Sequence, residues 1–182
     1  MLQPNFHPFP ELLTKRLLLR RLKSEDVHDI FFLRSDQNIL KFLSKEPVAD
    51  IKEAQDFISL INSNIDNNIA IMWAITLKGN PGKVIGTICF WQIQKEHFRA
   101  EIGYVLNPGY WRKGIMKEAI LKILDYGFSI LRLHSVEARL NPDNIASASV
   151  LESTGFIREA YYKEDFYFRG KFESTAVYSR LQ

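Results

Sequence analysis

The apolar residues of this chain change their spacing at residues 62–68, the polar segment NSNIDNN, and this change constrains the fold more than any other feature. Before it, apolar residues recur at helical spacing after Ser24 and again over residues 51–65, where Asp50 and Glu53 are placed as a capping box. After it, the apolar residues fall into shorter runs of strand type, separated by Gly, Pro and Asn turns. The chain is therefore expected to combine helices with a sheet.

The order of the expected elements indicates the fold class. They are a strand, two helices, three strands, a helix, a strand, a short helix and two strands, over residues 14–22, 24–34, 51–65, 69–77, 83–93, 99–106, 112–130, 134–140, 141–155, 156–168 and 171–181. A tight turn at residues 79–82, GNPG, joins the second and third strands. This order predicts an α+β fold, with a mixed, mainly antiparallel central sheet of about seven strands flanked by about four helices.

The sequence shows no internal division. No repeat, low-complexity tract or linker interrupts it, so residues 1–182 are expected to form a single domain, long enough for one sizeable hydrophobic core. Pro4, Pro8 and Pro10 predict that residues 1–11 form an extended N-terminal arm.

Composition and charge exclude several classes of partner. The 24 Lys and Arg residues barely outnumber the 21 Asp and Glu residues and form no basic block, so no nucleic-acid partner is expected. No run approaches 18 apolar residues and the first residues lack signal-peptide features, so no membrane association is expected. The single Cys89 fits a reducing compartment, and we expect a cytoplasmic location. No His or Cys spacing indicates a metal site.

The segment NPGYWRKGIMKEAI, residues 107–120, places two cations and a glycine at the start of a helix. The first turn of a helix leaves main-chain N–H groups unpaired, and the helix dipole adds partial positive charge there. Gly114 allows close approach to the backbone, while Arg112 and Lys113 add full charges. This arrangement predicts a phosphate or pyrophosphate site, although a basic helix start is also a common surface feature.

Three segments carry a family resemblance. Residues 111–116, WRKGIM, are similar to the acyl-CoA-binding motif Gln/Arg-x-x-Gly-x-Gly/Ala of the GNAT N-acetyltransferases. Residues 141–156, NPDNIASASVLESTGF, resemble the family pattern Asn-x-x-Ser-x-x-(Val/Leu)-Leu-Glu-x-x-Gly-Phe. Residues 12–22, LLTKRLLLRRL, look like the opening signature of the RimJ/RimL branch, which acetylates N-terminal residues of ribosomal proteins. The resemblance spans nearly the whole chain and implies a GNAT-like fold.

The resemblance implies acetyl-CoA as co-substrate and no metal. It assigns acetyl-CoA binding to Val105, Leu106, Trp111, Arg112, Lys113, Gly114, Ile115, Met116, Asn144 and Ser147. A main-chain N–H near Val105 is the implied donor to the acetyl carbonyl oxygen, and Asn144 binds the pantetheine arm, caps its helix, or does both. Trp111 stands where Gln or Arg is usual, and Met116 where Gly or Ala is usual.

Glu101 and Ser147 are the catalytic residues that the resemblance implies. Glu101 acts as the base, directly or through water, or is a solvated strand-end residue. Ser147 contacts the departing thiolate, relays a proton, or is a helix-face serine. Leu151 occupies the position where many relatives carry a Tyr acid, so no acid is assigned. Glu164 and Asp165 are further candidates at the acceptor pocket.

The implied reaction is direct transfer of an acetyl group to a primary amine in a ternary complex. At pH 7, neutralising an N-terminal α-amine with a pKa near 8 costs about 1.4 kcal/mol, against about 4.6 kcal/mol for a lysine with a pKa near 10.4. An α-amine acceptor therefore needs little from a base, and a protein N-terminus of the ribosomal-protein type is the acceptor we expect.

Two alternatives remain open at this stage. One is a small-amine acceptor, a polyamine, an amino acid or an aminoglycoside, and acidic residues lining the cleft would favour a polycation. The other is an acyl-CoA-binding module without catalysis. The sequence also leaves a homodimer open, because the two C-terminal strands offer an edge for pairing.

Overall fold

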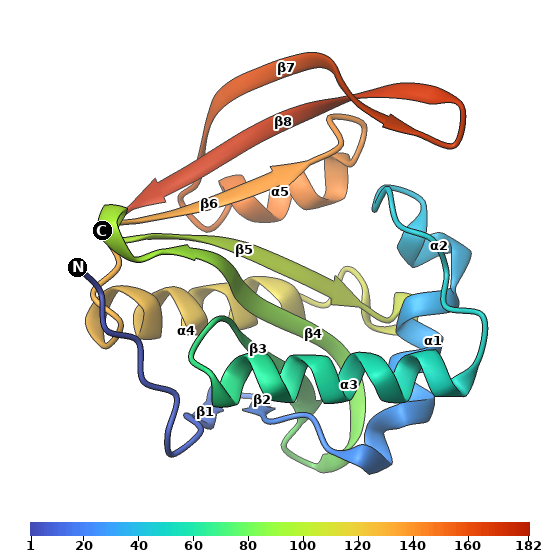
Figure 1. Cartoon of the computed structure of the whole chain (residues 1–182), viewed down its shortest axis with the longest axis vertical. Coiled ribbons are helices and arrows are strands. Elements are labelled where there is room, and N and C mark those ends of the chain that lie inside the picture. Colours follow the sequence, from blue (N-terminus) through green and yellow to red (C-terminus); the bar gives the residue numbers. More distant parts are fainter.

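One eight-stranded sheet forms the centre of the structure, a computed structural model that describes residues 1–182 (Figure 1). Its strand order is β1-β2-β3-β4-β5-β6-β8-β7. The strands are β1 (Leu12–Leu13), β2 (Leu17–Arg20), β3 (Ile71–Leu77), β4 (Asn80–Gln94), β5 (Arg99–Leu106), β6 (Ser135–Leu140), β7 (Ile157–Phe168) and β8 (Lys171–Leu181). Only β5 and β6 pair in parallel, while every other neighbouring pair is antiparallel.

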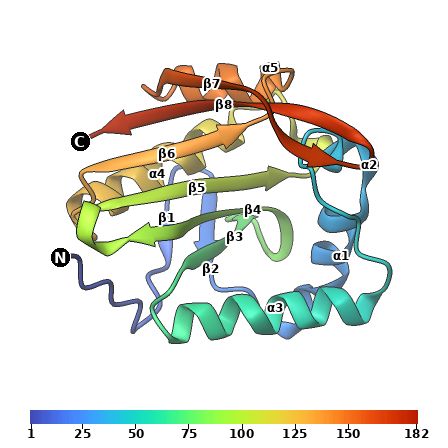
Figure 2. The same ribbon diagram turned by 45° about the horizontal axis from the view of Figure 1, so that its top comes forward.

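Helices cover both faces of this sheet. They are α1 (Val27–Ser35), α2 (Gln37–Leu40), α3 (Ile51–Asp66), α4 (Ile115–Ser129) and α5 (Ile145–Glu152). Figures 1 and 2 show α1 and α3 on one face and α4 and α5 on the other. None of these helices combines the length and the apolar character that a membrane crossing requires.

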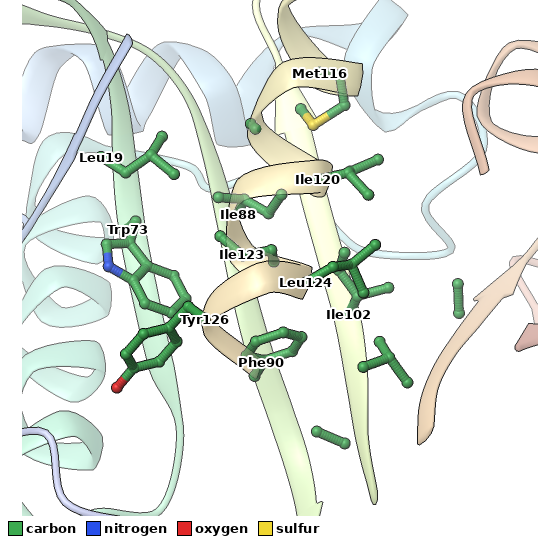
Figure 3. Packing of buried hydrophobic residues seen from close by; sticks show 14 of the residues in the cluster. Leu19, Trp73, Ile88, Phe90, Ile102, Met116, Ile120, Ile123, Leu124 and Tyr126 are labelled. Carbon is green, nitrogen blue, oxygen red and sulfur yellow. The ribbon is translucent and has the colours of Figure 1, made fainter. Parts of the chain in front are cut away.

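The larger part of the hydrophobic core lies between α4 and the sheet (Figure 3). The Trp73 ring lies edge-on to Tyr126 and Phe90, with ring centroids 5.5 Å and 6.2 Å apart and interplanar angles of 82°. Gly127 lets α4 approach this cluster, because a Cβ there would lie 2.9 Å from Phe90 Cζ. Close packing of this kind fixes the position of α4, and hence of the loop that precedes it.

The N-terminal segment, residues 1–11, forms no helix or strand and is packed against the rest of the chain. Leu2 and Phe6 are buried in the core. The Trp73 indole Nε1 donates a hydrogen bond of 2.7 Å to the Pro10 carbonyl oxygen. This segment therefore packs against one side of the core.

The feature that matters for function is the separation of β5 and β6. Their parallel pairing covers only three positions, from Arg99↔Ser135 to Glu101↔Glu137. Beyond Glu101 the two strands spread apart, as Figures 1 and 2 show. The edge of β5 that faces β6 therefore has no strand partner over its second half, and its main-chain groups border an opening.

The predicted fold class, a mixed and mainly antiparallel sheet flanked by helices, is confirmed. The sheet has eight strands and there are five α-helices, where about seven and about four were expected. The additions are β1, with two residues, and α2, with four, both too short for a periodic pattern; Asp36 caps α2 through its side chain. The tight turn lies at residues 78–79 rather than 79–82, because Asn80 pairs with Leu77 and starts β4.

Candidate active site

The separated strands border a cleft of about 1310 Å³. Its walls come from the second half of β5, the start of α4, α5, the end of β6, and the segment from α1 through α2. Ten of the eleven predicted site residues line it: Glu101, Val105, Leu106, Trp111, Arg112, Gly114, Ile115, Met116, Asn144 and Ser147. The residues assigned from two separate segments, 101–116 and 144–147, thus meet around one cavity.

The two faces of β5 give the cleft two chemically different sides. Because side chains alternate along a strand, Glu101 and Val105 share one face, and Ile102, Tyr104 and Leu106 share the other. Val105 packs with the smaller core under α1 and α3, while Ile102 and Leu106 belong to the larger core under α4. Glu101 therefore belongs to the α1/α3 side of the opening, and Tyr104 to the α4/α5 side.

Glu101 lies at the point where β5 and β6 separate, and only 7% of its surface is exposed. The pKa of this carboxyl is raised to about 7, first because burial disfavours the charged form and second because Glu137 lies nearby, while Arg139 partly offsets both. A carboxyl with this pKa exchanges a proton readily near neutral pH, which is the property that a general base requires.

A network of charges surrounds Glu101. The neighbouring Glu137 forms ion pairs with Arg99 and Arg139, the second at 3.5 Å. Arg139 also lies 3.9 Å from Asp165. Neither Asp165 nor Glu164, both suggested by the sequence, lines the cleft. Asp165 belongs to the outer part of this network and not to the site itself.

Tyr104 is a site residue that sequence reasoning missed. Its hydroxyl lies 2.7 Å from the Ser147 Oγ, a contact that joins β5 to α5 across the α4/α5 side of the cleft. Burial raises the pKa of Tyr104 well above its ordinary value, and the bond to Ser147 partly offsets this effect, so the phenol keeps its proton. The sequence contained one signal for this role. Tyr104 carries a hydroxyl in the expected strand EIGYVL, and because it stands three residues after Glu101, it lies on the opposite face of the strand.

The loop before α4 has the geometry of an anion site. Arg112 and Gly114 both have a positive φ, 58° and 71°, and Gly114 is the N-cap of α4. The Gly114 carbonyl accepts the N–H of Glu118, so the three preceding N–H groups, those of residues 115–117, have no acceptor within the helix. The side chains of Ile115 and Met116 are buried in the core, so these residues offer a ligand only their main chain.

A contact from the first strands holds this loop in place. Arg16, just before β2, donates from Nη1 to the Lys113 carbonyl oxygen at 2.8 Å and from Nε to the Glu118 carboxylate at 2.7 Å. Thr14 also donates to Glu118. We call these four residues the Arg16 latch. Thr14 and Arg16 are matched positions of the opening signature, so that signature supports the loop.

Two loop side chains take directions that the motif did not predict. The Trp111 Nε1 donates to the Leu106 carbonyl oxygen at 2.7 Å, closing the loop onto the end of β5. The Lys113 Nζ donates to the Gly109 carbonyl oxygen at 2.7 Å and lies over the Tyr110 ring. Lys113 is the one predicted site residue that does not line the cleft.

The start of α5 completes the site. The Asn144 side chain accepts the N–H of Ser147 at 3.1 Å, so the predicted N-cap is confirmed, and its amide NH₂ group remains available to a ligand.

Leu151 is fully buried in the core, so no ionisable group occupies the usual Tyr position. The Cys89 thiol is also accounted for, because burial raises its pKa to about 12 and keeps it protonated. No group of three His, Cys, Asp or Glu side chains is placed to hold a metal ion.

A mixed sheet whose strands β5 and β6 separate beside a glycine-containing helix start is typical of a class of acyl-transferring enzymes. The chain belongs to the GNAT acetyltransferase family, because the model of the acetyltransferase (GNAT) domain matches residues 16–157. It is an N-acetyltransferase.

Relatives of this chain include one whose name states no acceptor and two solved structures whose names state different acceptors. The uncharacterized N-acetyltransferase p20 of Bacillus licheniformis is 34% identical over 171 residues, which cover 94% of this chain and 96% of the relative. The ribosomal-protein-S5-alanine acetyltransferase of Vibrio fischeri is 26% identical, with a TM-score of 0.83 over 94% of this chain and 96% of that one. The spermidine N-acetyltransferase of Vibrio cholerae, solved with CoA and spermine, is 26% identical, with a TM-score of 0.81 over 93% and 97%.

Proposed function

We propose that this enzyme transfers the acetyl group of acetyl-CoA to the N-terminal α-amine of a protein or peptide, as the RimJ/RimL branch does. The observation that carries the proposal is the opening after Glu101, where one buried carboxyl of raised pKa faces a cleft that also holds the loop at Gly114. We further propose a cytoplasmic location and one catalytic domain over residues 1–182.

The residues of the cleft fit acetyl-CoA. Three free N–H groups at the start of α4 and the exposed Arg112 guanidinium suit a pyrophosphate. The Asn144 amide suits the pantetheine arm. The unpaired edge of β5 near Val105 suits the acetyl carbonyl oxygen, whose developing negative charge a main-chain N–H would stabilise. When bound, acetyl-CoA supplies the activated acyl group, and these groups of the chain hold and orient it.

The charges lining the cleft favour an α-amine over a polyamine. Five cationic side chains line it, Arg34, Lys45, Arg112, Lys117 and Arg139, against three anionic ones, Glu46, Glu101 and Glu173. Glu46 is paired with Arg169, and Glu173 accepts a hydrogen bond from Ser44. The cationic side chains are therefore in excess in the cleft, which disfavours a polycation, whereas the carboxyl of Glu101 is sufficient to take a proton from an α-amine.

Opposite faces of β5 then separate the removal of the amine proton from the stabilisation of the departing thiolate. On the α1/α3 side, Glu101 takes the proton of the attacking amine, directly or through water. On the α4/α5 side, Ser147 and Tyr104 lie where the CoA thiolate departs. Tyr104 holds its proton because of its raised pKa, and through Ser147 it donates a hydrogen bond toward the developing thiolate.

Replacing Tyr104 with Phe is expected to lower kcat about 10-fold with little change in the KM for acetyl-CoA. The reason is the loss of one hydrogen bond on the thiolate side, worth about 1.5 kcal/mol. Steady-state kinetics measure both constants. Tyr178→Phe is the matched control, because the Tyr178 hydroxyl also bonds to α5, at Glu152, but lies outside the cleft. Equal kcat values in Tyr104→Phe and the wild type would contradict this role.

A homodimer is part of the proposal. Strand β7 lies at the edge of the sheet. Large side chains of β7 and of its neighbour β8 are exposed, including Tyr167 of β7 at 62% and Phe172 of β8 at 66%. An edge strand with exposed aromatic residues is suited to pairing with a second copy.

Acetyl-CoA binding and an acceptor screen test the proposed function. At one hundred times its dissociation constant, acetyl-CoA is expected to stabilise the fold by roughly 2.7 kcal/mol and to raise Tm by about 5–10 °C. Thiol release is then measured with peptides that have a free or an acetylated N-terminus, and with spermidine. Turnover of the free peptide alone supports the proposal. Turnover of spermidine alone would replace the acceptor, and binding without turnover would favour a non-catalytic module.

A further inference from the structure

Arg34 is a cation of the cleft that the mechanism leaves unused. It lies on α1, lines the cleft, and is half-buried. Its Nε is buried and has no hydrogen-bond partner. No carboxylate forms an ion pair with it. Arg112 also lacks an ion pair, but that side chain is exposed to solvent.

The orientation of Arg34 is fixed by an aromatic ring. Its guanidinium carbon lies 3.9 Å from the centroid of the Phe57 ring of α3. Stacking of this kind leaves the N–H edge of the planar group free to bind a partner. Arg34 is therefore held in position before any ligand arrives.

Arg34 lies on the acceptor side of the opening. Helices α1 and α3 pack with Val105, which shares a face of β5 with Glu101, and the cleft wall formed by residues 30–46 adds Asn38 and Lys45. The loop before α4, which we propose binds CoA, and helix α5 belong to the opposite side. A ligand that contacts Arg34 is consequently the acceptor and not the cofactor.

Burial without a partner is unfavourable for a guanidinium. Burial lowers the pKa of Arg34, and Glu53 offsets this only from a distance. A carboxylate would remove this cost, because it accepts two parallel hydrogen bonds from a guanidinium.

We propose that Arg34 binds a carboxylate of the amine acceptor and so selects acceptors that carry a negative charge close to the reacting amine. This inference rests on the proposed function and deepens it. The carboxylate has two sources, an acidic side chain next to the N-terminus of a peptide or the α-carboxylate of a free amino acid. Spermidine has no carboxylate and meets only repulsion from Arg34.

Two matched pairs of acceptors separate these sources. The peptides Ser-Glu-Ala-amide and Ser-Gln-Ala-amide differ in one side-chain carboxylate, and serine and serinamide differ in the α-carboxylate. Each is assayed with the wild type and with Arg34→Met, which removes the charge and keeps an apolar contact with Phe57. Arg158→Met is the control, since Arg158 lies over the Tyr161 ring in a similar way but outside the cleft.

The wild type is expected to prefer the carboxylate member of one pair by roughly 10- to 100-fold in kcat/KM. Arg34→Met should abolish that preference, Arg34→Lys should restore part of it, and Arg158→Met should keep it. The pair that shows the preference identifies the source. A merely structural Arg34 would lower the rates of both members equally, and that result would overturn the inference while leaving the proposed function intact.

A binding measurement tests the role of Arg34 even if the enzyme turns over none of these acceptors. Calorimetry with the CoA-saturated enzyme compares the acetylated forms of the same four acceptors. Tighter binding of a carboxylate form, lost in Arg34→Met, supports the inference. Equal or absent binding of both members in each pair overturns it. A Tm shift with acetyl-CoA in the same sample shows separately whether the cofactor part of the proposed function holds.

Discussion

Replacing Gly114 with Glu will weaken acetyl-CoA binding at least 100-fold and remove the rise in Tm that the ligand causes. The new carboxylate would stand in front of the free N–H groups of α4, where it repels the pyrophosphate and competes for its site. The fold should survive, because a Cβ at Gly114 meets only Arg16 Nη2 at 3.6 Å and a negative charge is favourable at a helix start. Calorimetry and thermal unfolding with acetyl-CoA measure the effect.

The chain offers a matched control for backbone strain. Gly170, in the β7–β8 turn, also has a positive φ, 81°, and a Cβ there meets nothing within 4 Å. Gly170→Glu carries the same strain, about 1–2 kcal/mol, without touching the cleft. It should lower Tm by a similar amount and bind acetyl-CoA normally. Unchanged binding in Gly114→Glu would place the pyrophosphate elsewhere.

Replacing Glu101 with Gln is expected to lower kcat by about 10²–10³-fold with an α-amine acceptor. The same change should remove the dependence of the rate on an ionisation near pH 7. In the wild type the rate rises with pH until Glu101, with its pKa raised to about 7, is fully ionised. Initial rates between pH 5.5 and pH 9 test this. Glu173→Gln is the control, because Glu173 lines the cleft from β8 and should leave the ionisation in place. If a water molecule alone acts as the base, Glu101→Gln and the wild type should instead have nearly equal rates.

The same substitution should make the protein more stable at high pH. The folded carboxyl has a pKa of about 7, above its ordinary value of 4.5, so the folded state binds more protons than the unfolded state between these values. The contribution of Glu101 to stability is therefore full below the unfolded pKa and is lost as pH rises through about 7. Glu101→Gln should raise Tm by several degrees at pH 8 and by little at pH 5. Loss of activity with a gain in stability would identify a residue kept buried for its reactivity.

The sequence predicted the parts of this site that depend on local patterns. Gly114 at the helix start, Asn144 as an N-cap and Glu101 near the head of a strand each follow from a few neighbouring residues. The short elements β1 and α2 were missed, because two or four residues are not enough to show a period.

Contacts between distant segments were beyond the reach of the sequence. The Tyr104–Ser147 bond joins residues 43 positions apart, and its existence depends on how closely α5 packs against β5. The position of Arg34 over Phe57 likewise requires the packing of α1 on α3. The direction of Lys113 could not be predicted either, because the Gly109 carbonyl competes for its ammonium group only in the folded loop.

The Arg16 latch has a consequence for how the enzyme responds to its own cofactor. It joins main-chain and side-chain groups 102 positions apart. The shape of the loop before α4 therefore depends on the docking of the first strands. Coupling of this kind is reciprocal: the free energy by which the docked strands stabilise the loop equals the free energy by which the ordered loop stabilises the docking of the strands. A pyrophosphate bound to this loop, as proposed above, would therefore also stabilise the docked start of the chain, and fraying of the first strands would weaken cofactor binding.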